Sequence, residues 1–477
     1  MVCEIVRNSF RFRILPQPTI TQNLRQKALG AYDHVAARYS FLTQDVGLGA
    51  KIFESSALNR TGYEEYEKNF NSVLLGTFLN ALVNGSMIFF GPPGSGKTMT
   101  PEVVGQVLFG LSLEQIEEAT IYGHPNLTEE KMTASFDIPK LMQGQKEVVW
   151  SPWVLESYRM LDEANRIAPE TSAILLQAID RRRVSYAGQV TEMPYGPVYA
   201  TANYYDAGNF EMTKPFLDRF GISVHTEGLS PQDIDMLFMP EDELDRESYA
   251  LNKEEREQAY AEIQSIGIDK STMSLLSHLA SGLSSCGLAG NMWYDKHKGR
   301  FGEQAVECDG SKCGFDASKV VCSQIKEQGL TSRGLIALRD YSRAFAWLLG
   351  RESVDNEVMK IIFALVNAHR LTPSKIAMNG GESAEGVQID KSRFTRRTFD
   401  FNYHIWELAL NGFEAQNPIY AEINRFYDDI AGGAQSAQDL LTRSDEILIK
   451  VDAMEDPAKW EILKSLHRAR QILRARG

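Results

Sequence analysis

The chain has 477 residues, of which 43% are hydrophobic and 24% charged, an ordinary composition that excludes the disordered and fibrous classes. This length exceeds what one core supports, so we expect about two to four domains. A formal net charge of −13 weighs against a duplex-binding surface over the whole molecule. The N-terminus has no signal-like apolar run, no stretch is apolar enough to span a membrane, and the cysteine count of 5 is odd. These features predict a cytoplasmic location.

The segment from residue 61 to residue 228 alternates apolar runs with helical patterns. Apolar residues recur at helical spacing from Val73 to Leu82, and Asn84-Gly85 ends this helix before the buried run Met87–Phe90. We therefore expect an α/β domain with helices on the faces of a parallel sheet, preceded by an N-terminal extension over residues 1–60. Four further runs are predicted strands of the same sheet: Ile121-Tyr122, Val148–Trp150, Tyr158–Leu161 and Val198–Thr201.

The chain beyond Gly228 has helical patterns and few strand signals. We expect a second, helical domain over residues 229–372, interrupted by a Gly-, Lys- and Cys-containing insertion at 286–328. A polar linker follows, and residues 373–477 are predicted to end in a further helical region.

A glycine-rich motif directly follows the strand predicted at Met87–Phe90 and precedes a predicted helix. Its glycines let backbone N–H groups face a polyphosphate, Lys97 can reach the β- and γ-phosphates, and the Thr98 hydroxyl can bind Mg²⁺. This context predicts a P-loop that binds ATP, whereas a plain glycine-rich turn is the alternative. The motif is Gly91-Pro92-Pro93-Gly94-Ser95-Gly96-Lys97-Thr98.

Polar residues that end two other predicted strands complete the nucleotide site. Asp162 is predicted to hold Mg²⁺ through water, and Glu163 to orient and deprotonate the attacking water. An Asp-Glu pair is also common as a solvated turn, so this prediction depends on the P-loop. Asn203 can hydrogen-bond the γ-phosphate or the attacking water, although Asn by itself is more typical of a turn.

Five motifs occur in the order and approximate spacing of MoxR-type AAA+ ATPases, and the chain resembles that family from about Tyr63 to Leu371. The stretches from Gly350 to Glu352 and from His369 to Leu371 add to the likeness. The sequence departs from the family at Tyr204, where a proline is usual, and in the Cys-containing insertion. The five motifs are the P-loop, Leu161-Asp162-Glu163-Ala164-Asn165-Arg166, Ala200-Thr201-Ala202-Asn203, Leu217-Asp218-Arg219-Phe220 and Thr331-Ser332-Arg333.

The resemblance implies a ring, usually of about six subunits, with ATP at each subunit boundary. Arg219 resembles the arginine finger that reaches the neighbour's γ-phosphate, and Arg333 resembles the second-sensor arginine of a helical lid over residues 229–372. An ordinary surface salt bridge is the alternative for Arg219. Phe136–Trp153 resembles the β-hairpin insertion that lines the pore of related rings. Arg166 and the run Arg181–Arg183 can face the subunit boundary, although such runs are more often solvated.

MoxR-type proteins are regarded as chaperone-like remodellers that work with von Willebrand factor A domain proteins, so the resemblance implies a protein client or such a partner. An ATP-driven nucleic-acid remodeller is the alternative. In that case the basic helix that begins at Asp456-Pro457 would contact the phosphates of the nucleic acid. The apolar positions of that helix favour packing on the domain with the charges in solvent. A scaffold that binds ATP without turnover is a third reading, and the intact Glu163 disfavours it.

The insertion before Arg333 holds a cluster of cysteines. Cys308, Cys313 and Cys322, with Cys286 or His297 as a fourth ligand, are expected to bind a structural Zn²⁺ or to remain buried thiols, with even weight. The spacing contains no Cys-x2-Cys knuckle, and an iron–sulfur cluster and a disulfide are further alternatives.

Overall fold

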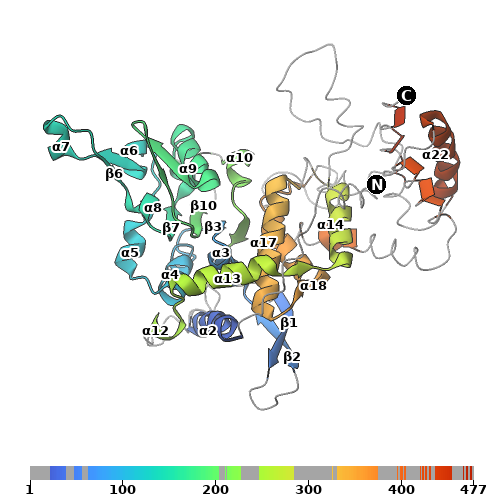
Figure 1. Ribbon diagram of the computed structural model, residues 1–477, viewed down its shortest axis with the longest axis horizontal. Helices are drawn as coiled ribbons and strands as arrows, with labels where there is room; N and C mark the ends of the chain where they lie inside the picture. Colours follow the sequence, from blue (N-terminus) through green and yellow to red (C-terminus); the bar gives the residue numbers. More distant parts are fainter. Residues whose placement is uncertain are drawn as a thin grey trace, which may run out of the picture. The chain divides into compact units, whose positions relative to one another are not determined.

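Figure 1 shows the computed structural model of the chain, which forms two compact units. One unit comprises residues 15–268 and 331–370, and the other comprises 1–14, 269–330 and 371–477. These units are not contiguous in sequence, and the predicted domain boundaries stay a prediction. The structure describes residues 22–38, 48–55, 63–203, 210, 212–226, 246–283, 325, 330–373 and 436–453, and scattered residues between 395 and 430 and between 463 and 474.

A five-stranded parallel sheet forms the centre of the first unit, which confirms the predicted α/β class. Four of its strands coincide with predicted apolar runs. The fifth was not predicted, because Ile222–His225 is a short run at the sheet edge. In spatial order the strands are β11 (Ile222–His225), β3 (Ser86–Gly91), β10 (Val198–Asn203), β7 (Arg159–Asp162) and β4 (Thr120–Tyr122).

Two helices flank β3 and the P-loop in the sequence. α3 (Ser72–Leu82) is buried along its whole length, and the side chain of its N-cap residue, Asn71, accepts the N–H of Leu74. α4 (Met99–Phe109) follows the P-loop directly and ends at Gly110 in the left-handed conformation. The sequence therefore passes from strand to loop to helix, as the P-loop prediction requires.

The run Val148–Trp150 is a strand, but its predicted place in the central sheet is wrong. It is β6, which pairs antiparallel with β5 (Ala134–Phe136) in a separate two-stranded sheet, with α7 (Ile138–Met142) between the two strands. Its residues are only partly buried, and so the run lacks the burial of a central strand. The hairpin expected over Phe136–Trp153 is thus present, with Gly144 at positive φ in its turn.

A second hairpin, β8 (Arg183–Tyr186) and β9 (Gln189–Glu192), follows α9 (Pro169–Arg181). The buried Arg159 of β7 ties the bases of both hairpins to the central sheet. Its Nε donates to the carbonyl of Trp153 at 2.9 Å, and its Nη2 donates to the carbonyl of Pro194 at 3.0 Å.

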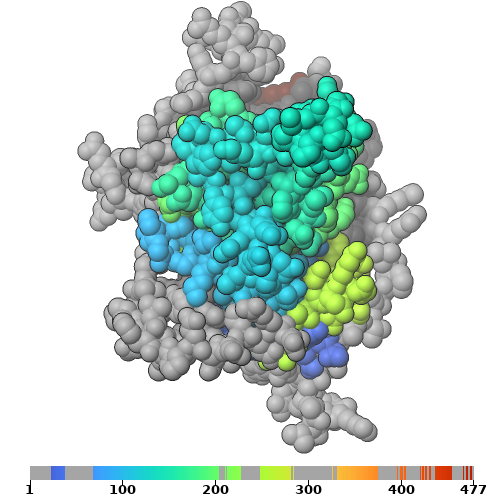
Figure 2. Space-filling model, turned by 90° about the vertical axis from the view of Figure 1, so that its left-hand side faces the viewer, coloured from blue at the N-terminus to red at the C-terminus, as the bar shows by residue number. Residues whose placement is uncertain are grey.

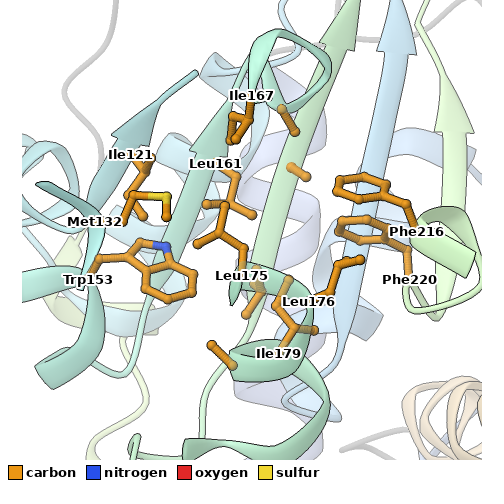
Figure 3. Packing of buried hydrophobic residues seen from close by; sticks show 14 of the residues in the cluster. Ile121, Met132, Trp153, Leu161, Ile167, Leu175, Leu176, Ile179, Phe216 and Phe220 are labelled. Atoms are coloured by element: carbon orange, nitrogen blue, oxygen red, sulfur yellow. The ribbon is translucent and has the colours of Figure 1, made fainter. Parts of the chain in front are cut away.

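The core beside the sheet is shown in Figure 3. Leu161 of β7 packs in one cluster with Leu175 and Leu176 of α9, and all three are buried. Trp153 is fully buried in the same cluster, and Phe216 lies 5.4 Å from Phe220 between ring centroids. Burial of each such side chain contributes about 1.5–3 kcal/mol to folding.

Two helices from a distant part of the chain belong to the same unit as the sheet. They are α17 (Ser332–Leu349) and α18 (Asn356–Asn367). α18 packs against β11, and α17 packs against α3.

In the other unit, α22 (Ala437–Asp452) packs its buried face in an apolar cluster with Phe426, Leu466 and Leu473. Leu466 and Leu473 are among the positions predicted to face the domain.

Candidate nucleotide site

The P-loop connects the carboxyl end of β3 to α4. Gly94 and Gly96 have φ of 76° and 74°, a region that glycine adopts without strain. Nζ of Lys97 donates to the carbonyls of Gly91, at 3.1 Å, and Pro92, at 2.5 Å. Burial lowers the pKa of Lys97, and the nearby carboxylates of Asp162 and Glu163 act in the opposite direction. An anion entering the loop would give this buried ammonium a charged partner.

Asp162 lies at the carboxyl end of β7, where two hydroxyl groups converge on one of its oxygens. Thr98 Oγ1 donates to Asp162 Oδ1 at 3.1 Å, and Thr201 Oγ1 donates to the same oxygen at 2.6 Å. Thr201 also accepts the backbone N–H of Glu163 at 2.9 Å. Thr201 therefore links the two acidic residues across strands, a role that only its place on the neighbouring strand reveals.

The oxygens of Thr98 and Asp162 fit a magnesium site. Mg²⁺ binds oxygen ligands and usually keeps several of its waters. Thr98 Oγ1 donates its proton to Asp162 Oδ1 at 3.1 Å, so its lone pairs can bind Mg²⁺ directly while Asp162 holds a metal-bound water. A hydroxyl and a carboxylate are also the donor types that Mg²⁺ prefers.

Glu163 follows β7 with φ 51° and ψ 47°, an uncommon conformation for a residue with a side chain. Asn203 Nδ2 donates to Glu163 Oε1 at 3.0 Å, and Arg166 Nη1 lies 3.0 Å from Glu163 Oε2. Both carboxylate oxygens therefore have partners. Asn165, which sequence reasoning did not single out, donates from Nδ2 to the carbonyl of Asn203 at 2.9 Å and fixes the spacing of these two strand ends.

The predicted arginine finger, Arg219, and the predicted second-sensor arginine, Arg333, meet on one carboxylate. Arg219 Nε and Arg333 Nη2 each donate to Asp180 Oδ2 at 3.0 Å. Arg333 Nη1 also donates to Asp218 Oδ2 at 3.4 Å. We call Asp180, Asp218, Arg219 and Arg333 the arginine cluster.

The arginine cluster lies at the amino end of β3, whereas the P-loop lies at the carboxyl end. Ser86, the first residue of β3, donates from Oγ to the carbonyl of Arg219 at 2.8 Å. Five residue steps at about 3.3 Å separate Ser86 from Gly91, which gives about 16 Å. The backbone of Arg219 is therefore a strand's length from the P-loop of its own chain.

The backbone around Arg219 is fixed by the end of α18. Arg370 is almost fully buried, pairs with Asp218 at 3.1 Å and donates to the carbonyl of Phe220 at 2.6 Å. His369 lies with Nε2 3.0 Å from the same carbonyl and with Nδ1 2.9 Å from Ser223 Oγ.

The basic run 181–183 does not lie uniformly in solvent. Arg182 has φ 51° and donates to the carbonyls of Gly196, at 2.6 Å, and Asn84, at 2.5 Å, while Arg181 and Arg183 are exposed. Arg182 is therefore a structural anchor of the second hairpin.

Several predictions lie outside the described residues. They concern Tyr204 and the cysteines Cys308, Cys313 and Cys322, with Cys286 and His297. Within the described part of the chain, no three or more His, Cys, Asp or Glu side chains are grouped to hold a metal ion. The zinc site stays a prediction without support. Among the described helices, none has the length and apolar character of a membrane span.

Comparisons with known proteins agree with this geometry. Residues 86–220 match the family model of the AAA domain, dynein-related subfamily, and residues 320–389 match the AAA lid domain. Protein MoxR of Paracoccus denitrificans is 24% identical over 334 residues, which cover 65% of this chain and 88% of the relative. A crystal structure of an inferred ATPase from Cytophaga hutchinsonii is similar in fold. Its TM-score is 0.51 at 16% identity, over 79% of this chain and 96% of that chain.

The fold, the P-loop and the acidic strand end define the class: the chain is an AAA+ ATPase, which binds and hydrolyses ATP. Within that class it is similar to MoxR-type proteins.

Proposed function

We propose that this ATPase works as a ring, usually of about six subunits. In this ring one subunit binds each ATP, and the arginines of the next subunit complete the ATP site. The supporting observation is the strand-length separation of Arg219 from its own P-loop, about 16 Å along β3. Because this span is too long for a side chain to bridge, Arg219 can serve only a nucleotide bound to another subunit.

In this proposal the residues at the carboxyl edge of the sheet bind the nucleotide and activate the attacking water. The backbone of residues 91–96 and Lys97 hold the phosphates, while Thr98 and Asp162 would hold Mg²⁺, which when bound neutralises phosphate charge. Glu163 orients the attacking water and takes its proton, and the hydrogen bond from Asn203 holds the Glu163 carboxylate toward that edge.

Arg219 and Arg333 bring positive charge to the phosphate of the neighbouring subunit. A fixed guanidinium stabilises the negative charge that develops on the phosphoryl oxygens, and arginine fingers contribute about 10³–10⁵-fold in kcat. Since both side chains converge on Asp180, we assign Arg333 to the same boundary as Arg219.

Mixing two inactive variants tests this division between subunits. Arg219→Ala subunits keep their P-loop, Lys97→Ala subunits keep their arginine, and each variant by itself should lose nearly all ATPase activity. Mixed rings should recover activity at boundaries where an intact P-loop meets an intact Arg219. The matched control replaces Lys97→Ala with the double variant Lys97→Ala/Arg219→Ala, which should recover nothing. A fully active monomer by light scattering would refute the ring.

We further propose that the ring remodels a protein client in the cytoplasm, with a von Willebrand factor A domain protein as partner. The hairpin of β5 and β6 with α7 between them, which we call the first hairpin, supports a contact with protein. It exposes apolar side chains: Ile138 is 62%, Met142 85% and Val149 48% exposed. α7 forms part of the face that Figure 2 turns toward the viewer.

Glu163→Gln provides the test for a client, because a subunit that binds ATP without hydrolysing it should retain its client. Proteins that co-purify with Glu163→Gln in the presence of ATP, and not with Lys97→Ala, are the expected result. A second pair, with Met142→Ser in the Glu163→Gln background, should lose the client if the first hairpin contacts it. Identical sets of proteins from all three variants would contradict the proposal.

A further inference from the structure

Asp180 is the only acidic residue, among those the structure describes, that contacts both Arg219 and Arg333. It lies in the last turn of α9, and the same oxygen, Oδ2, accepts hydrogen bonds from the two guanidinium groups at 3.0 Å each. The two arginines come from the turn before β11 and from the first turn of α17. No local sequence pattern joins these three segments.

Two guanidinium groups this close repel each other unless an anion lies between them. Like charges at this separation interact unfavourably even at the effective dielectric constant of a partly exposed site. A shared carboxylate offsets this repulsion, and charge-assisted hydrogen bonds also fix the direction of each guanidinium plane. The side chain of Asp180 is 24% exposed, so solvent screens these interactions only in part.

Asp180 is the charged partner of the Arg219 side chain, and the other contacts of Arg219 are with main-chain carbonyls and with its own backbone. Ser86 holds the Arg219 carbonyl, and Arg370 and His369 hold the next carbonyl, that of Phe220. Arg219 Nη1 donates to the carbonyl of Pro215 one turn earlier. Nε, the group nearest the aliphatic stem, points at Asp180.

We propose that Asp180 is a positioning residue for hydrolysis at the subunit boundary. It aligns Arg219 and Arg333 as one unit that carries two positive charges toward the neighbour's phosphate, and it never contacts the nucleotide itself. This inference rests on the proposed function, because it requires that Arg219 acts on a nucleotide.

Asp180→Asn removes the charge and keeps the size, so it tests alignment with little effect on folding. We expect kcat for ATP to fall about tenfold, because a misplacement of about 1 Å can cost about 10²-fold and a smaller shift costs less. KM and the equilibrium binding of ATP to the P-loop should change less than twofold. Asp180→Glu, which restores the carboxylate, should recover part of the loss. The matched control is Asp429→Asn, which breaks an ion pair with Arg443 in the other compact unit and should leave kcat unchanged.

The triple variant Asp180→Asn/Arg219→Ala/Arg333→Ala separates positioning from a general structural role. If Asp180 acts through the two arginines, the triple variant should hydrolyse ATP no more slowly than Arg219→Ala/Arg333→Ala. A wild-type rate for Asp180→Asn, with Arg219→Ala strongly impaired, would overturn this inference and leave the proposed function standing. A wild-type rate for Arg219→Ala would overturn both.

Discussion

The nucleotide site and the arginine cluster lie at opposite ends of β3 and are held together in different ways. At the carboxyl end, sheet register sets the neighbours: Asn203 of β10 pairs with Gly91 of β3, and Ala200 pairs with Leu161 of β7. The functional side chains there are at most a few residues beyond a paired strand position. At the amino end, Asp180, Arg219 and Arg333 come from a helix end, a turn and a helix start, and ion pairs join them.

Because of this difference, the two sites should respond differently to a single substitution. Backbone register is maintained by many hydrogen bonds, so one side-chain change at the carboxyl end should remove one chemical function and leave the rest in place. The arginine cluster depends on a few charged contacts with partial exposure, and Arg333 is 49% exposed. Its geometry should respond to any change of charge within it.

Among the substitutions that test the nucleotide site against the arginine cluster, Glu163→Gln should produce the largest effect. We expect ATP hydrolysis to fall about a hundredfold or more, because the amide cannot accept the proton of the attacking water. Binding of ATP should persist, since the P-loop and Asp162 are unchanged. Steady-state ATPase and equilibrium nucleotide binding measure the two effects, with Glu118→Gln on the exposed side of α5 (Leu113–Glu118) as control. Turnover at the wild-type rate would show that Glu163 is not the base.

Thr201→Val should have the next largest effect. The substitution keeps the shape of a side chain that is 1% exposed and removes its hydrogen bonds to Asp162 and to the N–H of Glu163. We expect about a tenfold fall in kcat, with unfolding made easier by about 1–3 kcal/mol because a buried N–H loses its partner. Thermal unfolding and ATPase assays on the same preparation test this. Thr120→Val in β4, which loses one bond to the carbonyl of Ile116, is the matched control. An unchanged kcat would mean that Thr201 does not hold the acidic pair.

Ser86→Ala should have a smaller effect at the other end of the sheet. It removes the hydrogen bond to the carbonyl of Arg219, which we expect to cost about 1 kcal/mol of stability. Because Arg370 and His369 still hold the neighbouring backbone, kcat should fall only a few-fold. A loss as large as that of Glu163→Gln would contradict the distributed support that we describe for Arg219.

DNA should have no effect on the ATPase. A protein that contacts several phosphates loses affinity steeply as salt rises, and we expect no such salt-dependent binding from this acidic chain. Of the predicted C-terminal helix, the described residues Leu466, Ala469 and Leu473 are buried in an apolar cluster, as a domain-packed helix requires. Micromolar binding of DNA that is lost on removal of residues 457–477 would favour the nucleic-acid remodeller instead.

The sequence was sufficient for the carboxyl end of the sheet. The P-loop, Asp162, Glu163 and Asn203 each follow an apolar run directly, and parallel strands carry their carboxyl ends to one edge, so local order implies spatial proximity. Reasoning from the sequence assigned Val148–Trp150 to the wrong sheet because apolar runs of three residues do not reveal their partners. It also missed β11 and Thr201, whose importance depends on strand order.

Only the tertiary structure brought Asp180, Arg219 and Arg333 together. The contact between Arg333 and Asp180 spans 153 residues, and nothing in the composition or periodicity of either segment indicates the other. A hydrogen bond within a strand or loop is fixed by covalent neighbours, whereas an ion pair between distant segments depends on how α9, the turn before β11 and α17 pack. The sequence determined the chemistry of ATP binding, and the packing of these three segments decided where the arginines lie and which carboxylate holds them.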